Sequence, residues 1–193
     1  MNYQLIHVLF LAYPQYADFE IAHALFLLRK IGKAKITTVS VNGKSVESVG
    51  GLRTHVEFSI SEINIKNFDL ILIAGGDGVR EIIEEEIVIN MLSSAYNLDI
   101  PIASICASAT LLAKAGILNG RKFTCLTSTY ENNKTLFKNS TYSGADIEVE
   151  KSIITAKGTA FAEFAVSICQ QLGLLIEQDN IDSALKFCKG ISS

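Results

Sequence analysis

The chain has 193 residues, of which 49% are hydrophobic and 19% are charged, and its formal net charge is −3. A chain of this length and composition can bury a core as one globular domain, residues 1–193, without a metal or a disulfide to hold it together. The net charge and the scattered Lys and Arg residues argue against nucleic acid and acidic membrane as partners, because both require a basic surface.

The first apolar segment, residues 5–12, predicts a buried strand and not a targeting signal. No basic region precedes it, no small-residue cleavage site follows it, and Tyr13 and Pro14 interrupt the apolar run. No other segment reaches the roughly 18 apolar residues that a membrane span needs. We therefore expect a cytoplasmic protein with no membrane partner.

The next elements are a helix, a strand and a hairpin. Apolar residues at three- and four-residue spacing predict a helix over residues 18–31, with Asp18 as its cap. Residues 36–41 predict a second strand. The pairs Asn42-Gly43 and Gly50-Gly51 are strong turn signals, so a β-hairpin insertion is expected between them.

The rest of the chain alternates between short strands and longer helices. Such alternation predicts an α/β layer fold with a mostly parallel sheet. Residues 128–137 remain ambiguous between loop and helix. The expected strands are residues 69–74, 100–105 and 122–126 and an antiparallel pair within 146–156, and the expected helices are 84–96, 107–115, 159–172 and 180–188.

Cys106 lies where a predicted strand passes directly into a predicted helix. A tight turn of this kind pushes the corner side chain above the carboxyl edge of the sheet. The amides and dipole of the new helix favour the thiolate, so we expect a thiol pKa below the ordinary value of about 8.5. The sequence thus predicts a nucleophile elbow with an ionised cysteine. The alternative is a small buried apolar residue.

Two further stretches could complete a site around Cys106. The glycines of "AGGDG", Gly75 and Gly76, end another strand, and either amide could join that of Ala107 in binding a developing oxyanion. The alternative is a plain turn. Glu20 lies in the first helix near its apolar face, where burial beside a thiolate would keep it protonated, so that it donates a hydrogen bond to sulfur. The alternative is an exposed acid that the helix dipole favours.

Three stretches together resemble the ThiJ/PfpI superfamily, and most closely its Parkinson-linked deglycase/chaperone group with the bacterial relatives: "ADFE", "AGGDG" and "ASICASATLLAKAGILNGRKFT". The resemblance runs over residues 5–173. It implies a flavodoxin-like three-layer α/β sandwich, a homodimer, a nucleophilic cysteine at a strained backbone position and a glutamate that touches its sulfur. The matching positions are Cys106, Glu20, Gly75, Gly76 and Ala107.

The chain also departs from the family pattern. Relatives with peptidase-like activity place histidine directly after the cysteine, where this chain has Ala107, and others place it in a loop where this chain has Leu126. We expect the three histidines, His7, His23 and His55, to be structural. Without a histidine, a Cys-His hydrolase lacks its general base. "KGTA" also replaces a Gly-Pro-Gly-like turn of the family.

We therefore expect a cysteine-dependent enzyme that acts on reactive carbonyls or their adducts, of the glyoxalase or deglycase type, with a small-molecule substrate and neither metal nor organic cofactor. Cys106 would attack the carbonyl, Glu20 would shuttle the proton, and backbone amides would hold the oxygen. One alternative is an oxidative-stress sensor or redox-dependent chaperone that works through Cys106 oxidation. An intracellular amidase or peptidase ranks lower. Cys125 and Thr127 are candidate pocket residues, although a buried strand position is favoured for Cys125.

Overall fold

The computed structural model describes residues 5–191 and contains a central sheet of seven strands. Its strand order is β10-β11-β7-β6-β1-β2-β5, and every neighbouring pair is parallel except β10 and β11. The strands are β1 (His7–Leu11), β2 (Lys35–Ser40), β5 (Phe58–Ser59), β6 (Leu70–Ile73), β7 (Ile102–Ile105), β10 (Ile147–Glu150) and β11 (Ile153–Ala156).

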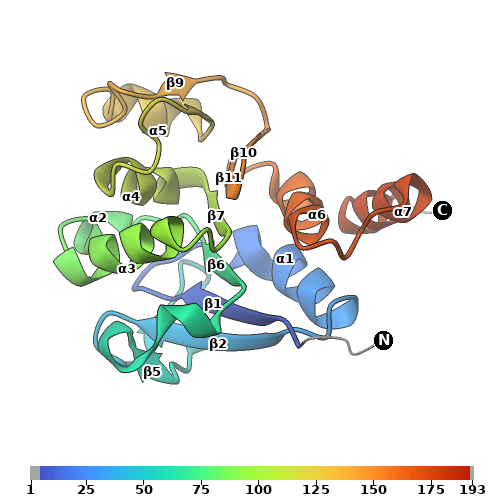
Figure 1. The fold of residues 1–193 in the computed structure, drawn as a ribbon, viewed down its shortest axis with the longest axis horizontal. Helices are drawn as coiled ribbons and strands as arrows, with labels where there is room; N and C mark the ends of the chain where they lie inside the picture. The colour runs from blue at the N-terminus through green and yellow to red at the C-terminus, as the bar shows by residue number, and fades with distance from the viewer. Residues whose placement is uncertain (1–4, 192–193) are drawn as a thin grey trace.

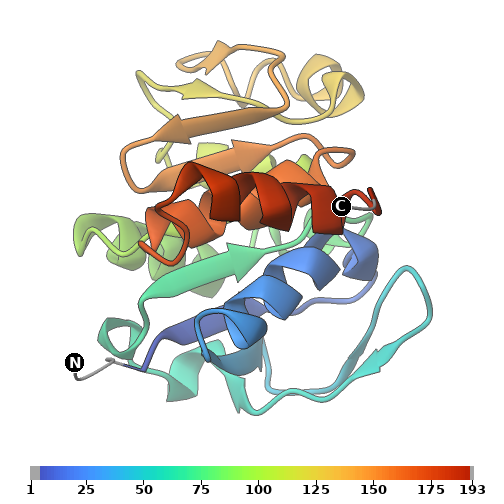
Figure 2. The same cartoon turned by 90° about the vertical axis from the view of Figure 1, so that its right-hand side faces the viewer.

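Helices cover both faces of this sheet, which confirms the predicted α/β sandwich with a mostly parallel sheet. Figure 1 shows α1, α6 and α7 on one side and α2, α3 and α4 on the other, and Figure 2 shows the first group in front of the strands. The helices are α1 (Asp18–Lys30), α2 (Val79–Ile82), α3 (Glu86–Asn97), α4 (Ala109–Lys114), α5 (Thr127–Asn132), α6 (Phe161–Gln171) and α7 (Gln178–Cys188).

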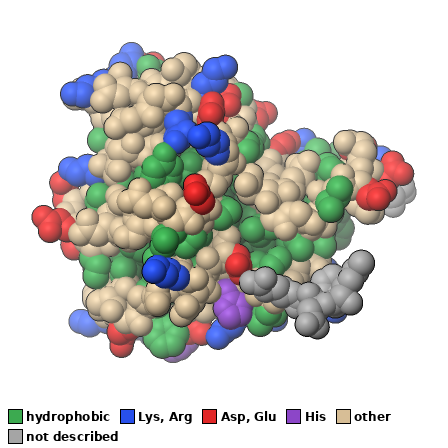
Figure 3. Space-filling model, viewed as in Figure 1, with side chains coloured by type: hydrophobic (Ala, Val, Ile, Leu, Met, Phe, Trp, Pro, Cys, Tyr) green, Lys and Arg blue, Asp and Glu red, His purple; other side chains and the backbone are tan. Residues whose placement is uncertain are grey.

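The middle of the sheet forms the core. Every residue of β6, β7 and β11 is buried, as expected for apolar parallel strands that are covered on both faces. None of the helices within residues 5–191 is long and apolar enough to cross a membrane. On the face that Figure 3 shows, Lys and Arg side chains lie scattered and do not form one patch.

Two small ribbons and three short 3-10 turns complete the fold. The predicted hairpin is present as the antiparallel pair β3 (Val46–Glu47) and β4 (Arg53–Thr54), with Gly51 at φ 82° in its turn. A second ribbon pairs β8 (Lys122–Phe123) with β9 (Thr141–Tyr142). The 3-10 turns are η1 (Ile60–Glu62), η2 (Ile65–Asn67) and η3 (Cys106–Ser108).

Several expected boundaries are wrong. The helix expected over residues 84–96 is α3, which begins at Glu86 because Glu85 adopts an extended conformation, and the short α2 before it was not expected. The strand expected over 122–126 pairs only at residues 122–123, and the ambiguous segment from residue 128 begins inside α5.

Asp18 is not the cap of α1. The N-cap is Ala17, and the Asp18 side chain makes a tertiary contact instead, because the Ser48 hydroxyl donates to its Oδ2 at 2.7 Å. Asp18 therefore ties the start of α1 to the hairpin.

Candidate active site

Cys106 follows β7 directly, and its backbone has φ 62°, a left-handed conformation that is rare for a residue with a side chain. The Ser108 hydroxyl holds this turn: it donates to the Ile105 carbonyl at 2.8 Å and accepts from the Ile105 amide at 3.1 Å. Ser104 adds a hydroxyl contact to Ser108 at 2.8 Å. A strained position persists only where its surroundings fix it, and these buried serines supply that support.

The first turn of α1 brings Glu20 to this elbow, although 86 positions in the sequence separate the two residues. The Glu20 carboxyl group lies beside the Cys106 thiol, and the Gly75 amide donates to Glu20 Oε2 at 2.7 Å. Glu20 is 2% exposed and Cys106 is 9% exposed. Segments that follow β1, β6 and β7 therefore meet at one edge of the sheet and enclose a thiol and a carboxyl group.

Two glycines make this close approach possible. A Cβ at Gly75 would lie 2.6 Å from both Glu20 Oε2 and the Cys106 Cβ. A Cβ at Gly158 would lie 2.7 Å from Glu20 Oε1 and 2.8 Å from the Cys106 sulfur. The sequence analysis missed Gly158 as a site residue. Its signal is a glycine just after a buried strand, in the "KGTA" stretch, and that strand is β11, which pairs with β7.

Burial controls the protonation of Glu20. Removal from water raises the pKa of its carboxyl group to about 7, even though hydrogen bonds from the Cys106 thiol and the Gly75 amide favour the carboxylate and lower it. A carboxyl group with this pKa changes its charge near neutral pH, where a general acid or base works best.

The expectation of a lowered thiol pKa is wrong for the folded site. Burial raises the pKa of Cys106, the nearby Glu20 charge and hydrogen bond raise it further, and the Ala107 amide, which lowers it, does not compensate. The turn after Cys106 is the short η3, and the sulfur is buried, which the sequence does not show. At neutral pH, Cys106 is a thiol beside a carboxyl group that can accept its proton.

The three backbone amides have different surroundings. The sequence predicts Gly75 as a donor to a substrate oxygen, but in the structure its amide donates to Glu20, so it positions the carboxyl group instead. The Ala107 amide hydrogen-bonds the Cys106 sulfur. Gly76 has φ 127°, and a Cβ there would lie 2.2 Å from the Gln15 carbonyl oxygen, so this position requires glycine.

Tyr13 is a second residue that the sequence analysis missed. Its hydroxyl is fully buried and lies 2.6 Å from the Ala74 carbonyl oxygen and 2.8 Å from that of Gly75, to which it donates. Burial raises the pKa of Tyr13, and the charges of Glu20 and Cys106 raise it further, so it remains a neutral donor. Tyr13 thus fixes the peptide whose amide holds Glu20.

A hollow of about 340 Å³ adjoins the elbow. Gly76 and Ala107 line it, together with Arg80 and Asn133. Cys125 is fully buried, and burial raises the pKa of its thiol to about 12, so it has no exposed surface through which to contact a ligand. Thr127 lies at the surface, with its hydroxyl 3.2 Å from that of Tyr142.

The histidine side chains make no hydrogen bond to the Cys106 thiol within residues 5–191. His7 begins β1, and His55 is exposed beyond the hairpin. His23 stacks on Phe161 with the ring centres 5.3 Å apart, and its Nδ1 is buried without a hydrogen-bond partner within residues 5–191. Neither Ala107 nor Leu126, where the motif resemblance would place a histidine, supplies a base.

Comparison with known proteins places these features in a family. A sequence model described as the DJ-1/PfpI family matches residues 6–171. An uncharacterized protease named YdeA, from Bacillus subtilis, is 31% identical over 85% of this chain and 82% of its own length. A deglycase from Pyrococcus horikoshii is 26% identical over 61% of this chain and 70% of its own length.

The fold has solved counterparts as well. The crystal structure of a DJ-1 superfamily protein from Agrobacterium tumefaciens matches with a TM-score of 0.84 at 22% identity, and the match covers 96% of this chain and 99% of that one. At this identity the likeness concerns the fold. It agrees with the sandwich that the sequence motifs imply.

Proposed function

The chain belongs to the DJ-1/PfpI family, and from that premise we propose that it is a cysteine-dependent enzyme acting on reactive carbonyls or their adducts. The observation that carries the proposal is the buried pair of Glu20 and Cys106, in which a carboxyl group with a pKa of about 7 lies beside the thiol. The deglycase name of the Pyrococcus horikoshii relative supports the same substrate class.

Glu20 is the base in the first step. Above a pH of about 7 it is ionised and takes the thiol proton while the Cys106 sulfur bonds to the carbonyl carbon. This transfer avoids a free thiolate, which burial makes costly. The electron pair of the C=O double bond moves to the oxygen, and the protonated Glu20 returns the proton to give a hemithioacetal.

Backbone amides stabilise the oxygen during this step. Gly76 and Ala107 line the hollow beside the elbow, so a carbonyl that enters it approaches their amides. The Gly75 amide stays with Glu20 and keeps the carboxyl group against the sulfur. The size of the hollow, about 340 Å³, suits a small carbonyl compound.

The experiment that tests this proposal is the conversion of methylglyoxal to lactate, a net addition of one water, in the absence of glutathione. We expect wild-type turnover that Cys106→Ser abolishes and Glu20→Gln reduces by about 100-fold, the lower end of general-base contributions. Cys188→Ser is the matched control, since Cys188 is also buried and lies on α7. The proposal would be refuted if Cys106→Ser turned over substrate at the wild-type rate. It would also be refuted if the wild-type protein converted neither methylglyoxal nor the adducts of methylglyoxal with amines and thiols.

A second candidate function is an oxidation sensor or redox-dependent chaperone. Cys106 is 9% exposed whereas Cys125 and Cys169 are fully buried, and below a pH of about 7 the protonated Glu20 can donate a hydrogen bond to an oxidised sulfur. Mass spectrometry after limited peroxide treatment should then find two added oxygens on Cys106 first. Equal oxidation of all four cysteines would argue against it. The lower-ranked amidase function is supported only by the protease names of YdeA and of YoaZ, a second Bacillus subtilis relative, and no histidine hydrogen-bonds the thiol within residues 5–191.

We also propose that the chain is a homodimer. Phe19, Val49 and Leu52 are large apolar residues at the surface, and the contact between Asp18 and Ser48 brings their segments together. Leu52 is 60% exposed, so Leu52→Asp should weaken a dimer without disturbing the core. Light scattering coupled to gel filtration should show a dimer for the wild type and a smaller mass for the variant. A monomeric wild type would refute the proposal.

A further inference from the structure

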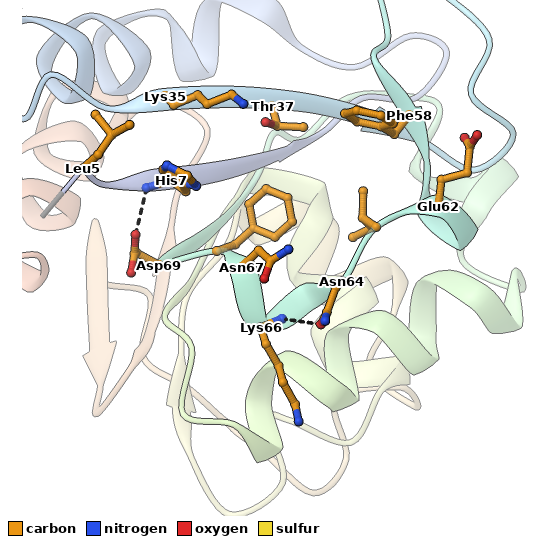
Figure 4. A pocket seen from close by; sticks show the side chains of 12 residues that line it. Leu5, His7, Lys35, Thr37, Phe58, Glu62, Asn64, Lys66, Asn67 and Asp69 are labelled. Carbon is orange, nitrogen blue, oxygen red and sulfur yellow. Dashed lines mark hydrogen bonds between the residues drawn. The ribbon is translucent and has the colours of Figure 1, made fainter.

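A second and larger hollow lies at the opposite end of the sheet from Cys106. It has a volume of about 630 Å³, within the range of small-molecule sites. His7 and Lys35, the first residues of β1 and β2, line it, whereas Cys106 follows the last residue of β7. In Figure 4 the side chains from β1, β2 and the segment before β6 surround this space.

The chain connection explains why the space is open. In this sheet α1 joins β1 to its neighbour β2, and α2 and α3 join β6 to its neighbour β7, but the connection from β5 to β6 contains only the 3-10 turns η1 and η2. Such turns are short and present few side chains. They pack against α3 and leave the starts of β1 and β2 uncovered on this side.

The lining is apolar along one part and cationic along another. Phe58, Ile63 and Phe68 provide apolar surface, and Phe58 is exposed. Lys35 and Thr37 follow one another on one face of β2, and in Figure 4 the Lys35 ammonium group lies toward the Thr37 hydroxyl. Thr37 is 7% exposed, so it is a buried polar side chain that borders the hollow.

The acidic residues of the hollow already have hydrogen-bond partners. Glu62 accepts from the Ser59 amide at 2.8 Å and from the Ser59 hydroxyl at 2.7 Å, which lowers its pKa and keeps it ionised. Asp69 accepts from the His7 amide at 2.8 Å. Lys35 has no ion pair with any residue in the described range 5–191. Lys35, one of the two lysines that line the hollow, is therefore available to a ligand, while the carboxylates are held by the protein.

We propose that this hollow binds a small molecule that carries one anionic group on a flat apolar body, such as an aromatic carboxylate. The anion lies beside Lys35, Thr37 and His7, where an ammonium group, a hydroxyl and an imidazole can donate hydrogen bonds. The flat body covers Phe58 and Phe68. This site is separate from the Cys106 site and does not depend on its activity.

The test is a titration of the full-length protein with 2-naphthoate, followed by amide chemical shifts in two-dimensional NMR. We expect saturable shifts in β1, β2 and the η1–η2 segment, and at least tenfold weaker binding of 2-naphthalenemethanol, which has the same rings but no charge. Lys35→Met should weaken 2-naphthoate binding about tenfold, and Thr37→Val should weaken it severalfold. Lys138→Met, which removes an exposed lysine outside the hollow, is the matched control and should bind as the wild type does.

The same spectra report whether each variant is folded, so lost binding is distinguishable from unfolding. The proposal would be overturned if 2-naphthoate caused no saturable shift in these segments or if 2-naphthalenemethanol bound equally well. It would also be overturned if folded Lys35→Met and Thr37→Val both bound 2-naphthoate as the wild type does. Methylglyoxal turnover by Lys35→Met, measured in parallel, should equal that of the wild type.

Discussion

The Glu20 carboxyl group and the Cys106 thiol lie side by side at a site from which water is almost excluded. Burial raises the pKa of both groups, so the pair loses its first proton only near pH 7. The remaining proton lies between a sulfur and a carboxylate oxygen. Two ordinary side chains thus acquire acid–base behaviour at neutral pH from their position, without a histidine.

The pair predicts a particular pH dependence for Cys106 alkylation by iodoacetamide. The rate should rise as Glu20 ionises, with a midpoint at about pH 7, because the carboxylate then accepts the thiol proton. Glu20→Gln should lose this inflection and react about 100-fold more slowly at pH 7.5. The rate is measured peptide by peptide with mass spectrometry, and Cys188→Ser is the control. A full rate in the wild type at pH 5 would contradict the prediction, since it would require a thiolate with a lowered pKa.

Glu20 should also make stability depend on pH. Its folded pKa of about 7 lies above the ordinary value of 4.5, so the folded chain keeps a proton that the unfolded chain releases. Stability from this group is therefore present below pH 4.5 and is lost as the pH rises to about 7. The loss is on the order of 3 kcal/mol by pH 8.

Glu20→Gln removes this titration while it keeps an acceptor for the Gly75 amide. The free energy of unfolding of the variant, relative to the wild type, should increase between pH 4 and pH 8. Urea denaturation at several pH values measures the difference, and other titrating groups cancel because both proteins share them. A constant difference would mean that Glu20 has an ordinary pKa.

The sequence predicted most of the scaffold because its signals are local. The apolar runs of β6 and β7 and the turn glycines of the hairpin each mark an element without reference to any other. Cys106 was identified in the same way, from a change of residue type at one point of the chain. Glu20 was a candidate because of its place near the apolar face of the first helix, and the motif resemblance added support for its contact with sulfur.

The features that the sequence did not predict depend on contacts between segments that are distant in the chain. Gly158 became part of the site only because β11 pairs with β7 and places the following turn over the thiol. Asp18 looked like a cap, but its partner is Ser48 in the hairpin. The direction of the Cys106 pKa shift was wrong because local helix geometry was visible in the sequence and burial was not.

The strained backbone of Cys106 predicts an unusual order of stability among substitutions. Alanine is ordinarily more stabilising than glycine by roughly 0.5–1 kcal/mol. At φ 62° the order should reverse, because only glycine adopts this conformation without cost. We expect the Cys106→Gly variant to be more stable than the Cys106→Ala variant, with a free energy of unfolding higher by about 1 kcal/mol. Urea denaturation measures this difference. Ala109→Gly in α4 is the control and should lower stability. If Cys106→Ala is the more stable, the elbow is not strained.

Gly158→Ala tests whether the close approach over the thiol is needed for the pair. The new Cβ would lie 2.7 Å from Glu20 Oε1 and 2.8 Å from the Cys106 sulfur, so the two side chains must move apart. We expect the protein to fold with a loss of about 1–3 kcal/mol in stability, as for other overpacked sites. The pH 7 inflection in alkylation should be lost, because a displaced Glu20 no longer accepts the thiol proton.

Thr159→Ala, a change at the exposed neighbouring residue of the same turn, is the matched control and should leave alkylation and stability unchanged. If the Gly158→Ala variant keeps both the pH 7 inflection in Cys106 alkylation and wild-type turnover, Glu20 and Cys106 tolerate displacement from each other. Glu20 would then act without a fixed contact to sulfur, which is difficult to reconcile with a buried carboxyl group held by one amide. The expected loss would instead establish Gly158 as a positioning residue for the pair.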